Sequence, residues 1–394
     1  MPAPACAPES SILMMTDTDY MREALELAAR GLGHTRPNPP VGAVVVHPDG
    51  TVIGRGWHRR AGEAHAEVLA LQEAGDSARG ATLYVTLEPC NHTGRTGPCT
   101  TAILDAGIAR VVVGTRDPNP HVDGGGAAHL KRHGVSVEFG VCGEEAAWII
   151  RFFAHHMRHG RPWVIAKTAT SLDGRVATAS GESQWITGDE ARAHAHGVRA
   201  VVDAILVGVG TVVADNPQLT ARRSGGWAGD HATSHAQAPG SLHQPMRVVL
   251  DGSGRIPLDA TLVGPGTLVL TTNRMPDATR RALEDAGCAV HLCASTDDTR
   301  VSMDDALNVL GGLGIQSLLV EGGPTVLGAF LDAGCVDEWH AYMAPVVIGG
   351  LGAPASVAGE GSRQLGLAPR LRDRRVHVLG DDVLISGTIS DWRT

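Results

Sequence analysis

The stretch TLYVTLEPCNHTGRTGPC, residues 82–99, places an apolar run directly before two cysteines, Cys90 and Cys99, each of which follows a proline. A short apolar run bounded by turn signals predicts a buried strand, here over 81–88. That strand would deliver Cys90 at its carboxyl end. The two cysteines fit a disulfide, half of a structural zinc site, or two ligands of a catalytic metal, and the rest of the chain must decide among these.

The segments around this strand alternate between helical and strand patterns. Asp17 or Asp19 is expected to cap the first helix, and Gly31 or Gly33 to end it. Such alternation predicts one sheet covered by helices, as βαβ units require. The expected helices are 17–35, 64–75, 101–107 and 126–134, and the expected strands are 41–47, 51–57, 81–88, 109–114 and 135–141.

The chain changes character near residue 158, where a helix over 146–162 gives way to a strand over 163–174. The second part alternates again and closes on a hairpin over 375–390. Two domains are therefore expected, residues 15–157 and 160–394. The Gly-, Ser- and His-rich stretch 224–244 is expected to be a surface insertion rather than a metal site.

Composition excludes several classes of protein. A chain of 394 residues favours two or three domains. A net charge of −9 with two lysines in all argues against a nucleic-acid binder, which usually carries a basic face. The chain has no apolar run near the roughly 20 residues of a membrane span and does not begin like a signal peptide. We expect a cytoplasmic protein, and reduced thiols there disfavour the disulfide.

Upstream of the cysteines, the sequence GEAHAE (62–67) supplies His65 and Glu67 at a predicted helix start. His65, Cys90 and Cys99 give one nitrogen and two sulfur ligands, which leaves the fourth position of a tetrahedral zinc ion to water. Zinc lowers the pKa of that water toward about 7, and Glu67 could then move protons. His-x-Glu followed by Pro-Cys-x-x-Cys is the signature of zinc deaminases, although Cys99 here follows after eight residues rather than two.

Three interpretations of this first part stay open from the residues alone. The metal site could belong to a deaminase of a small molecule or to a deaminase of nucleic acid. It could also belong to a zinc-stabilised scaffold that is not an enzyme. The scaffold requires a fourth protein ligand, for which Cys142 or His92 would be the candidates.

In the second part, glycines follow two predicted strands. Thr211 comes after one, and Glu321-Gly322-Gly323 precedes a helix opened by Pro324. Backbone N–H groups at such a helix start can hold a phosphate, but each glycine pair could equally be a plain turn. Neither stretch matches the dinucleotide fingerprint of three spaced glycines. The residues alone therefore predict an α/β domain with a candidate phosphate ligand.

Eight stretches together carry a resemblance that covers nearly the whole chain: PNPPVGAVVV (37–46), AGEAHAE (61–67), TLYVTLEPCNHTGRTGPC (82–99), RDPNPHVDGGG (116–126), AKTATSLDGR (166–175), GESQWIT (181–187), DAILVGVGTVVADNPQLTAR (203–222) and LLVEGGPTV (318–326). They closely resemble the bifunctional deaminase/reductases of riboflavin biosynthesis, in the same order along the chain. Gly97 stands where that family usually has proline. The resemblance implies an α/β protein with a cytidine-deaminase-like α/β/α layer domain followed by a dihydrofolate-reductase-like α/β domain.

By this resemblance, His65, Cys90 and Cys99 match the Zn²⁺ ligands and Glu67 matches the catalytic proton donor. The positions that match NADPH contacts are Ala169, Trp185, Thr211, Asp215, Gly323, Pro324 and Thr325. The positions that match substrate contacts are Asn38, His58 and Arg95 in the first domain and Ser183, Arg199, Leu219, Arg222 and Glu321 in the second. Arg199 and Arg222 suit a sugar phosphate, because a guanidinium binds phosphate with two donors.

The resemblance implies two steps. The first is hydrolytic deamination of 2,5-diamino-6-ribosylamino-4(3H)-pyrimidinone 5′-phosphate, and the second is NADPH-dependent reduction of the ribosyl group, which gives 5-amino-6-ribitylaminouracil 5′-phosphate. The expected partner is thus a small phosphorylated pyrimidine, with neither nucleic acid nor a membrane, and family members often self-associate. Lys167 could polarise a carbonyl or imine or pair with Asp173, while His194 and His196 are expected to be solvated on a helix.

Overall fold

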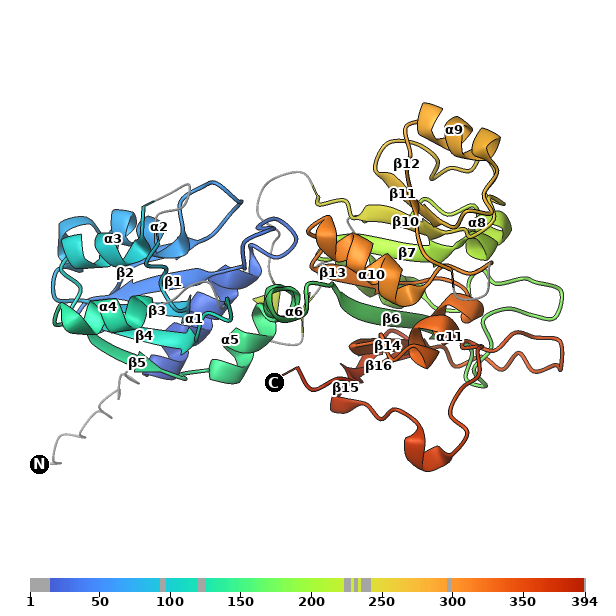
Figure 1. The fold of residues 1–394 in the computed structure, drawn as a ribbon. Coiled ribbons are helices and arrows are strands. Elements are labelled where there is room, and N and C mark those ends of the chain that lie inside the picture. Colours follow the sequence, from blue (N-terminus) through green and yellow to red (C-terminus); the bar gives the residue numbers. More distant parts are fainter. Residues whose placement is uncertain are drawn as a thin grey trace, which may run out of the picture. The chain divides into compact units, whose positions relative to one another are not determined.

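The computed structural model describes residues 15–92, 97–119, 125–222, 228–229, 233–234, 242–295 and 299–392. They form two compact units. The first unit runs through Gly31 and resumes over Pro40–Ile149, and the second contains Leu32–Pro39 together with the chain from Ile150 onward. Each unit is built on its own mixed sheet (Figure 1). No helix in the described part of the chain is long and apolar enough to cross a membrane.

The sheet of the first unit has the strand order β2-β1-β3-β4-β5. Strand β1 pairs antiparallel with both β2 and β3, whereas β3, β4 and β5 are parallel. Buried valines, alanines and leucines fill these strands because both faces of the sheet are covered. The strands are β1 (Gly42–Val46), β2 (Val52–Trp57), β3 (Thr82–Leu87), β4 (Arg110–Thr115) and β5 (Ser136–Phe139).

Helices cover the two faces of this sheet in separate sets (Figure 1). Apolar side chains of α2, α3 and α4 pack on one face, and those of α1 pack on the other. The cap of α1 is Thr16 and neither Asp17 nor Asp19, because Thr16 and Asp19 bond reciprocally as a capping box. The helices are α1 (Asp17–Ala29), α2 (Ala66–Ala74), α3 (Cys99–Asp105), α4 (Gly126–Arg132) and α5 (Gly143–Ile149), with a 3₁₀ turn η1 (Gly75–Ala78).

The second unit contains a sheet with the order β12-β11-β10-β7-β13-β6-β14-β16-β15. Its strands are parallel from β12 through β14, and β16 and β15 form an antiparallel hairpin at one edge. The strands are β6 (Trp163–Thr170), β7 (Ala204–Gly208), β10 (Met246–Leu250), β11 (Thr267–Thr271), β12 (Ala289–Leu292), β13 (Ser317–Val320), β14 (Glu338–Met343), β15 (Arg372–Leu379) and β16 (Asp382–Thr388), beside a separate pair β8 (Ala228–Gly229) and β9 (Thr233–Ser234).

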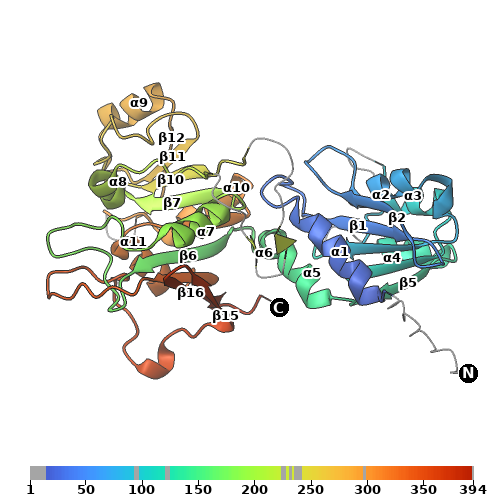
Figure 2. The same ribbon diagram turned by 180° about the vertical axis from the view of Figure 1, so that it is seen from behind.

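Two helical layers enclose this larger sheet (Figures 1 and 2). One core joins the strands to α10 and α11, and a second core joins their opposite side chains to α6, α7, α8 and α9. The helices are α6 (Arg151–His159), α7 (Asp189–Arg199), α8 (Val209–Asp215), α9 (Asp277–Asp285), α10 (Met303–Gly312) and α11 (Pro324–Asp332), with a 3₁₀ turn η2 (Leu365–Leu367).

The single helix predicted over 146–162 is wrong, because the structure divides it into α5 and α6 at Ile150. Ala146 packs against β4, where a side chain at Gly114 would collide with it. Phe152 instead joins Trp163 in the core of the second unit. Ala146 and Phe152 thus belong to different cores, and the chain leaves the first unit between these two residues.

Candidate active sites

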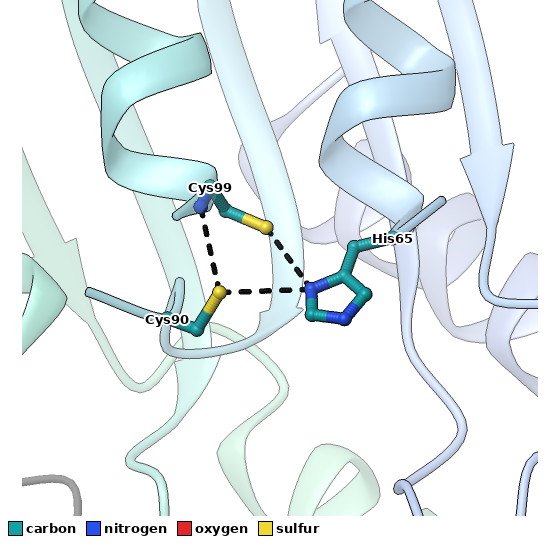
Figure 3. A group of neighbouring side chains, drawn as sticks. All are labelled: His65, Cys90 and Cys99. Carbon is teal, nitrogen blue, oxygen red and sulfur yellow. Dashed lines mark hydrogen bonds between the residues drawn. The ribbon is translucent and has the colours of Figure 1, made fainter. Parts of the chain in front are cut away.

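One metal-binding group occurs among the described residues, and it is the group that the sequence predicted, His65, Cys90 and Cys99 (Figure 3). Their ligand atoms all lie within 4.8 Å of one another. The Nδ1 atom of His65 is 3.2 Å from the Sγ of Cys99 and 3.6 Å from the Sγ of Cys90. Ligand atoms around one tetrahedral zinc ion lie roughly 3.5 to 3.8 Å apart, given the usual zinc–ligand bond lengths.

Strand and helix ends bring these three side chains together. Cys90 follows β3 after a two-residue turn, Cys99 is the first residue of α3, and His65 is the N-cap of α2. The backbone N–H of Cys99 donates to the Sγ of Cys90 at 3.4 Å. Partial positive charge at a helix start stabilises a thiolate, so the start of α3 favours the charged form of Cys90.

Cys90 and Cys99 shift one another's pKa in opposite directions. The hydrogen bond with Cys99 is the largest influence that lowers the pKa of Cys90, to about 4, and the same bond raises the pKa of Cys99. The bond to Cys90 raises the pKa of His65. A zinc ion would displace the protons of its cysteine ligands and bind both sulfurs as thiolates. One imidazole nitrogen and two sulfurs within reach of a single point therefore fit zinc.

Glu67 lies one residue into α2, is 4% exposed and does not belong to the ligand group. Burial is the largest cause that raises the pKa of this carboxyl, and the negative charge of Cys90 raises it further. Its interactions with Cys90, His65 and Cys99 place the carboxyl beside the ligands. This combination of position and raised pKa suits a group that alternately accepts and gives a proton.

No fourth His, Cys, Asp or Glu joins the metal group in the part of the chain that the structure describes. Cys142, one candidate for closing the site, instead points its Sγ toward the carbonyl of Thr18 at 3.9 Å. His92, the other candidate, is also outside the group. The scaffold hypothesis predicted a closed site, so these positions count against it.

The structure places the other predicted residues of the first domain in different surroundings. His58 is buried, its ring centroid lies 5.2 Å from that of His65, and its Nδ1 is 3.2 Å from the carbonyl oxygen of Ala64. Asn38 belongs to Leu32–Pro39, which clusters with the second unit. Arg95 lies outside the described residues. The geometry therefore brings His58 to the metal group.

In the second unit, a cavity of about 2110 Å³ opens along the carboxyl ends of the parallel strands. Every residue that the resemblance assigned to the second domain lines this cavity: Ala169, Ser183, Trp185, Arg199, Thr211, Asp215, Leu219, Arg222, Glu321, Gly323, Pro324 and Thr325. Its size exceeds a usual small-ligand pocket and can take a cofactor together with a substrate. The roles of these residues remain predictions.

A buried ionic group forms the polar centre of the cavity. The Nε and Nη2 atoms of Arg199 each donate to the carboxylate of Glu321 at 2.7 Å, and the Nζ of Lys167 lies 3.9 Å from it. Burial works to raise the pKa of Glu321, but Arg199 and Lys167 outweigh it and lower the pKa to about 2. Burial lowers the pKa of Lys167. Lys167 thus pairs with Glu321, and the suggested pairing with Asp173 is wrong.

A close backbone approach borders this ionic group. Gly322 lies just past the end of β13, and a Cβ on it would lie 2.4 Å from the Cα of Val207, so the chain can approach β7 this closely only through glycine. Gly323 has φ of +41° and is the N-cap of α11, where no side chain caps the helix. The start of α11 is therefore open to an anion, which fits the phosphates of a dinucleotide.

Sequence reasoning missed several residues that line the cavity. His196 faces it and has a pKa lowered to about 4, chiefly by burial, whereas His194 bonds with the Tyr342 hydroxyl at 2.8 Å. The expectation that both are solvated is wrong. The spacing of three residues between His196 and Arg199 would have revealed their shared helix face. Ser253, Arg255 and Arg300 also line the cavity, and no motif marked them.

Comparison with protein families identifies relatives of both units. Residues 14–115 match the cytidine and deoxycytidylate deaminase zinc-binding region, and residues 162–385 match the RibD C-terminal domain. The chain is 42% identical over 380 residues to the riboflavin biosynthesis protein RibD of Escherichia coli (strain K12), covering 94% of this chain and 99% of the relative. It is 41% identical over 377 residues to that of Bacillus amyloliquefaciens, covering 95% and 96%.

Solved structures give a similar result. Acinetobacter baumannii RibD, form 1, superposes with a TM-score of 0.83 at 39% identity, over 95% of this chain and 99% of that one. A diaminohydroxyphosphoribosylaminopyrimidine deaminase/5-amino-6-(5-phosphoribosylamino)uracil reductase from Thermotoga maritima superposes with a TM-score of 0.78 at 34% identity, over the same shares of the two chains. The similarity thus extends over both units.

Proposed function

The chain belongs to the RibD family of riboflavin-biosynthesis proteins, and from that premise we propose which of its residues carry out each of two reactions. The protein is a bifunctional enzyme with a zinc-binding deaminase domain and a reductase domain that uses NADPH. We assign deamination to residues 15–157 and reduction to residues 160–394. The proposed substrate is 2,5-diamino-6-ribosylamino-4(3H)-pyrimidinone 5′-phosphate, and the proposed final product is 5-amino-6-ribitylaminouracil 5′-phosphate.

In the deaminase, His65, Cys90 and Cys99 hold the zinc ion. When bound, the ion would act as a Lewis acid that makes a water molecule nucleophilic near neutral pH. A carboxylate oxygen of Glu67 takes a proton from that water and later gives it to the departing amino group, which leaves as ammonia. The buried position of Glu67 keeps bulk water from competing for this proton. His58, beside His65, orients the substrate ring.

In the reductase, a bound cofactor would supply the hydride that reduces the sugar at C1′. The start of α11, at Gly323, Pro324 and Thr325, holds the cofactor pyrophosphate through backbone N–H groups. Trp185 is 69% exposed on the cavity wall and has the guanidinium of Arg192 4.6 Å above its ring. Its exposed ring surface would cover the nicotinamide. Ala169, Thr211 and Asp215 complete the cofactor side.

The substrate lies on the other side, against Ser183, Leu219 and the ionic group. Arg199 uses three of its five donors on Glu321 and Thr220. Arg222 is exposed and lines the same wall, so Arg222 is the main phosphate ligand and Arg199 assists. The Glu321 carboxylate accepts from ribose hydroxyls, and Lys167 keeps that carboxylate charged.

The observation that carries this proposal is the metal group with three protein ligands beside a buried carboxyl. The test supplies the diamino substrate with and without NADPH and identifies the products by mass. Without NADPH, the mass should rise by the difference between an oxygen and an NH group. With NADPH, the product should gain two further hydrogens. A protein that contains zinc and releases no ammonia would contradict the deaminase assignment.

We propose a small phosphorylated pyrimidine as the substrate rather than a nucleic acid. In the first unit, the metal group lies beside one buried carboxyl, that of Glu67. In the second unit, the cavity has Arg199, Lys167 and Glu321 at its polar centre. Ammonia release from the free pyrimidine but not from tRNA would support this. The cytoplasm is the proposed compartment, because the thiolate ligands require reducing conditions.

We also place self-association in the proposal. Strand β15 is the outer strand of its sheet, and Val376 and Val378 on it are 64% and 75% exposed. Exposed apolar residues on an edge strand invite pairing with another strand. A second copy of this chain would cover them. Sedimentation velocity should give a dimer or larger species, and Val378→Arg should shift the protein toward the monomer.

A further inference from the structure

The hairpin of β15 and β16 contributes one buried acid to the start of α7. Asp382 is the first residue of β16, and its Oδ2 accepts from the backbone N–H of Gly188 at 2.7 Å. Gly188 is the N-cap of α7 and has no side chain with which to cap the helix. The first N–H groups of a helix lack partners within it, so Asp382 replaces a local cap from 194 positions away in the chain.

Gly188 is also the end of a loop that forms part of the cavity wall. Residues 183–187 lead directly into it, and all of them line the cavity. The other end of the loop follows a hydrogen-bonded turn over 178–182. Ser183 and Trp185, which the resemblance assigned to substrate and cofactor, therefore lie between two fixed points. The hydrogen bond to Gly188 is one of these two points.

Trp185 is connected to the same helix start through a second residue. The guanidinium of Arg192, near the start of α7, lies 4.6 Å from the centroid of the Trp185 ring. The same guanidinium donates to the carbonyl oxygen of Thr187 and to the carboxylate of Asp189. A displacement of the helix start would therefore move the indole ring together with the loop.

Other contacts would keep the body of α7 in place without the hydrogen bond to Gly188. Ala191 packs with Tyr342 and Leu384 in a small core. The Nδ1 of His194 lies 2.8 Å from the hydroxyl oxygen of Tyr342. Both contacts lie further along the helix than its N-cap. Loss of the hydrogen bond should thus loosen the helix start and the loop, and leave the sheet and its helices folded.

We propose that Asp382 is a positioning residue of the reductase, whose hydrogen bond to Gly188 holds the loop 183–187 in the conformation that binds substrate and cofactor. The proposal rests on the proposed roles of Ser183 and Trp185 in this cavity. Asp382 itself is not among the described residues that line the cavity. When the loop is in place in only a fraction of the molecules, the apparent affinity falls by that fraction, while the bound complex reacts at its normal rate.

Steady-state reduction of the deaminated substrate by Asp382→Ala and Asp382→Asn tests this role. The alanine has no acceptor, so KM for NADPH and KM for the substrate should rise by about 10- to 100-fold, as expected for a hydrogen bond to a charged group. At saturation, kcat should stay within about twofold of the wild type. The asparagine keeps an oxygen that can accept from Gly188 and should restore both KM values to within about threefold.

Asp381→Ala is the matched control, because Asp381 is the exposed neighbour of Asp382 in the same hairpin turn. It should keep the wild-type KM and kcat. A variant that is only less stable would lose kcat in proportion to its folded fraction and keep a normal KM.

That result in Asp382→Ala would overturn the proposal, as would KM values in Asp382→Asn that are as high as those in Asp382→Ala. Wild-type KM values in Asp382→Ala would overturn it as well. In each of these cases the wild type still reduces the substrate, whereas a wild type that reduces nothing would contradict the proposed reductase function itself.

Discussion

The metal group of the first unit takes all its ligand atoms from residues 65, 90 and 99, whereas the cavity of the second unit is lined from residue 167 to residue 360. Three side chains at one corner of a sheet suffice to bind an ion. The cavity needs the ends of four strands in the correct spatial order. The residues of the first site thus lie within a short stretch of sequence, whereas those of the second site come together only when strands distant in the sequence pair.

This difference has energetic consequences. In the first unit, deamination depends on one ion held by three ligands, so removal of one ligand should abolish deamination. In the second unit, binding energy is spread over arginines, a helix start and apolar walls. Single changes there should weaken binding or stability by amounts that can be measured, and the two activities should respond independently.

The substitution with the largest expected effect is Cys99→Ser, which should affect the first site and not the second. We expect loss of bound zinc and of deaminase activity down to background, because two ligands hold zinc poorly. Reduction of the already deaminated substrate should keep its wild-type rate. Zinc content by plasma mass spectrometry and separate assays of the two steps provide the measurement.

Cys142→Ser is the matched control, since Cys142 belongs to the same unit but not to the metal group. It should keep both zinc and ammonia release. Full zinc occupancy with normal deamination in Cys99→Ser would show that the ligand assignment is wrong.

The next largest effect should come from Glu67→Gln. An amide cannot carry the proton, so deamination should fall by about 10² to 10⁴, the usual contribution of a general acid–base group. Zinc should remain bound because Glu67 is not a ligand. Ammonia release per zinc ion is the quantity to measure.

Glu73→Gln on the same helix is the control. Glu73 accepts from the backbone N–H of Arg55 at 3.1 Å, away from the metal group. Its ammonia release should stay near the wild-type value. Equal losses in the two variants would mean that Glu67 supports the fold of α2 rather than proton transfer.

Glu321→Gln tests the second region. Removal of this charge leaves Arg199 and Lys167 buried without their acidic partner, which should cost about 3 to 5 kcal/mol of unfolding free energy. Reduction should also fall, whereas deamination should not. Urea unfolding gives the energy, and the transition of the second unit is the one that added NADP⁺ moves to higher urea.

The exposed Glu284 on α9 provides a control, and Glu284→Gln should leave the NADP⁺-sensitive transition in place. A Glu321→Gln protein as stable as the wild type would show that the ionic group contributes no net stability. Single substitutions at the polar centre of the cavity would then affect stability no more than substitutions elsewhere in its lining.

The same contrast explains what the sequence could predict. The proposed zinc ligands and Glu67 lie beside a strand and two helix starts, and local patterns locate all of these elements. The pairing of Lys167 with Glu321 depends on β13 lying beside β6, although over 100 residues separate them in the chain. Arg255 and Arg300 depend on two loops meeting at Gly252. No local pattern encodes such contacts, and the resemblance found only the part of the cavity that carries motifs.

The division between α5 and α6 has the same cause. The sequence pattern of 146–162 predicts one helix, and only tertiary packing shows that Ala146 and Phe152 pack against different sheets. Helix propensity is local, but the choice between two cores is not. The assignment of Leu32–Pro39 to the second unit could not be predicted either, because Gln316 holds the Pro37 carbonyl at 2.7 Å across 279 positions of the chain.

The smallest expected difference between the two sites is in their response to low pH. The pKa of Glu321 is lowered to about 2 from an ordinary 4.5, so its stabilising contribution is complete above about pH 4.5 and is lost as the pH falls toward 2. At about 1.4 kcal/mol per pKa unit, the whole contribution is about 3 kcal/mol. The difference in unfolding free energy between wild type and Glu321→Gln should therefore be constant from pH 7 to pH 5 and shrink below pH 4.5.

The metal group should respond differently, because protons compete directly with zinc for its imidazole and thiolates. Zinc release should therefore begin at a higher pH than the loss of the Glu321 contribution. Urea curves at several pH values, with zinc release followed by a chromogenic chelator, measure both. If the free-energy difference between wild type and Glu321→Gln already shrinks between pH 7 and pH 5, the carboxyl titrates near its ordinary value. Arg199 and Lys167 would then not keep the Glu321 carboxylate charged. The ionic group of the cavity would lose its stabilising effect in the same pH range in which the metal group releases zinc.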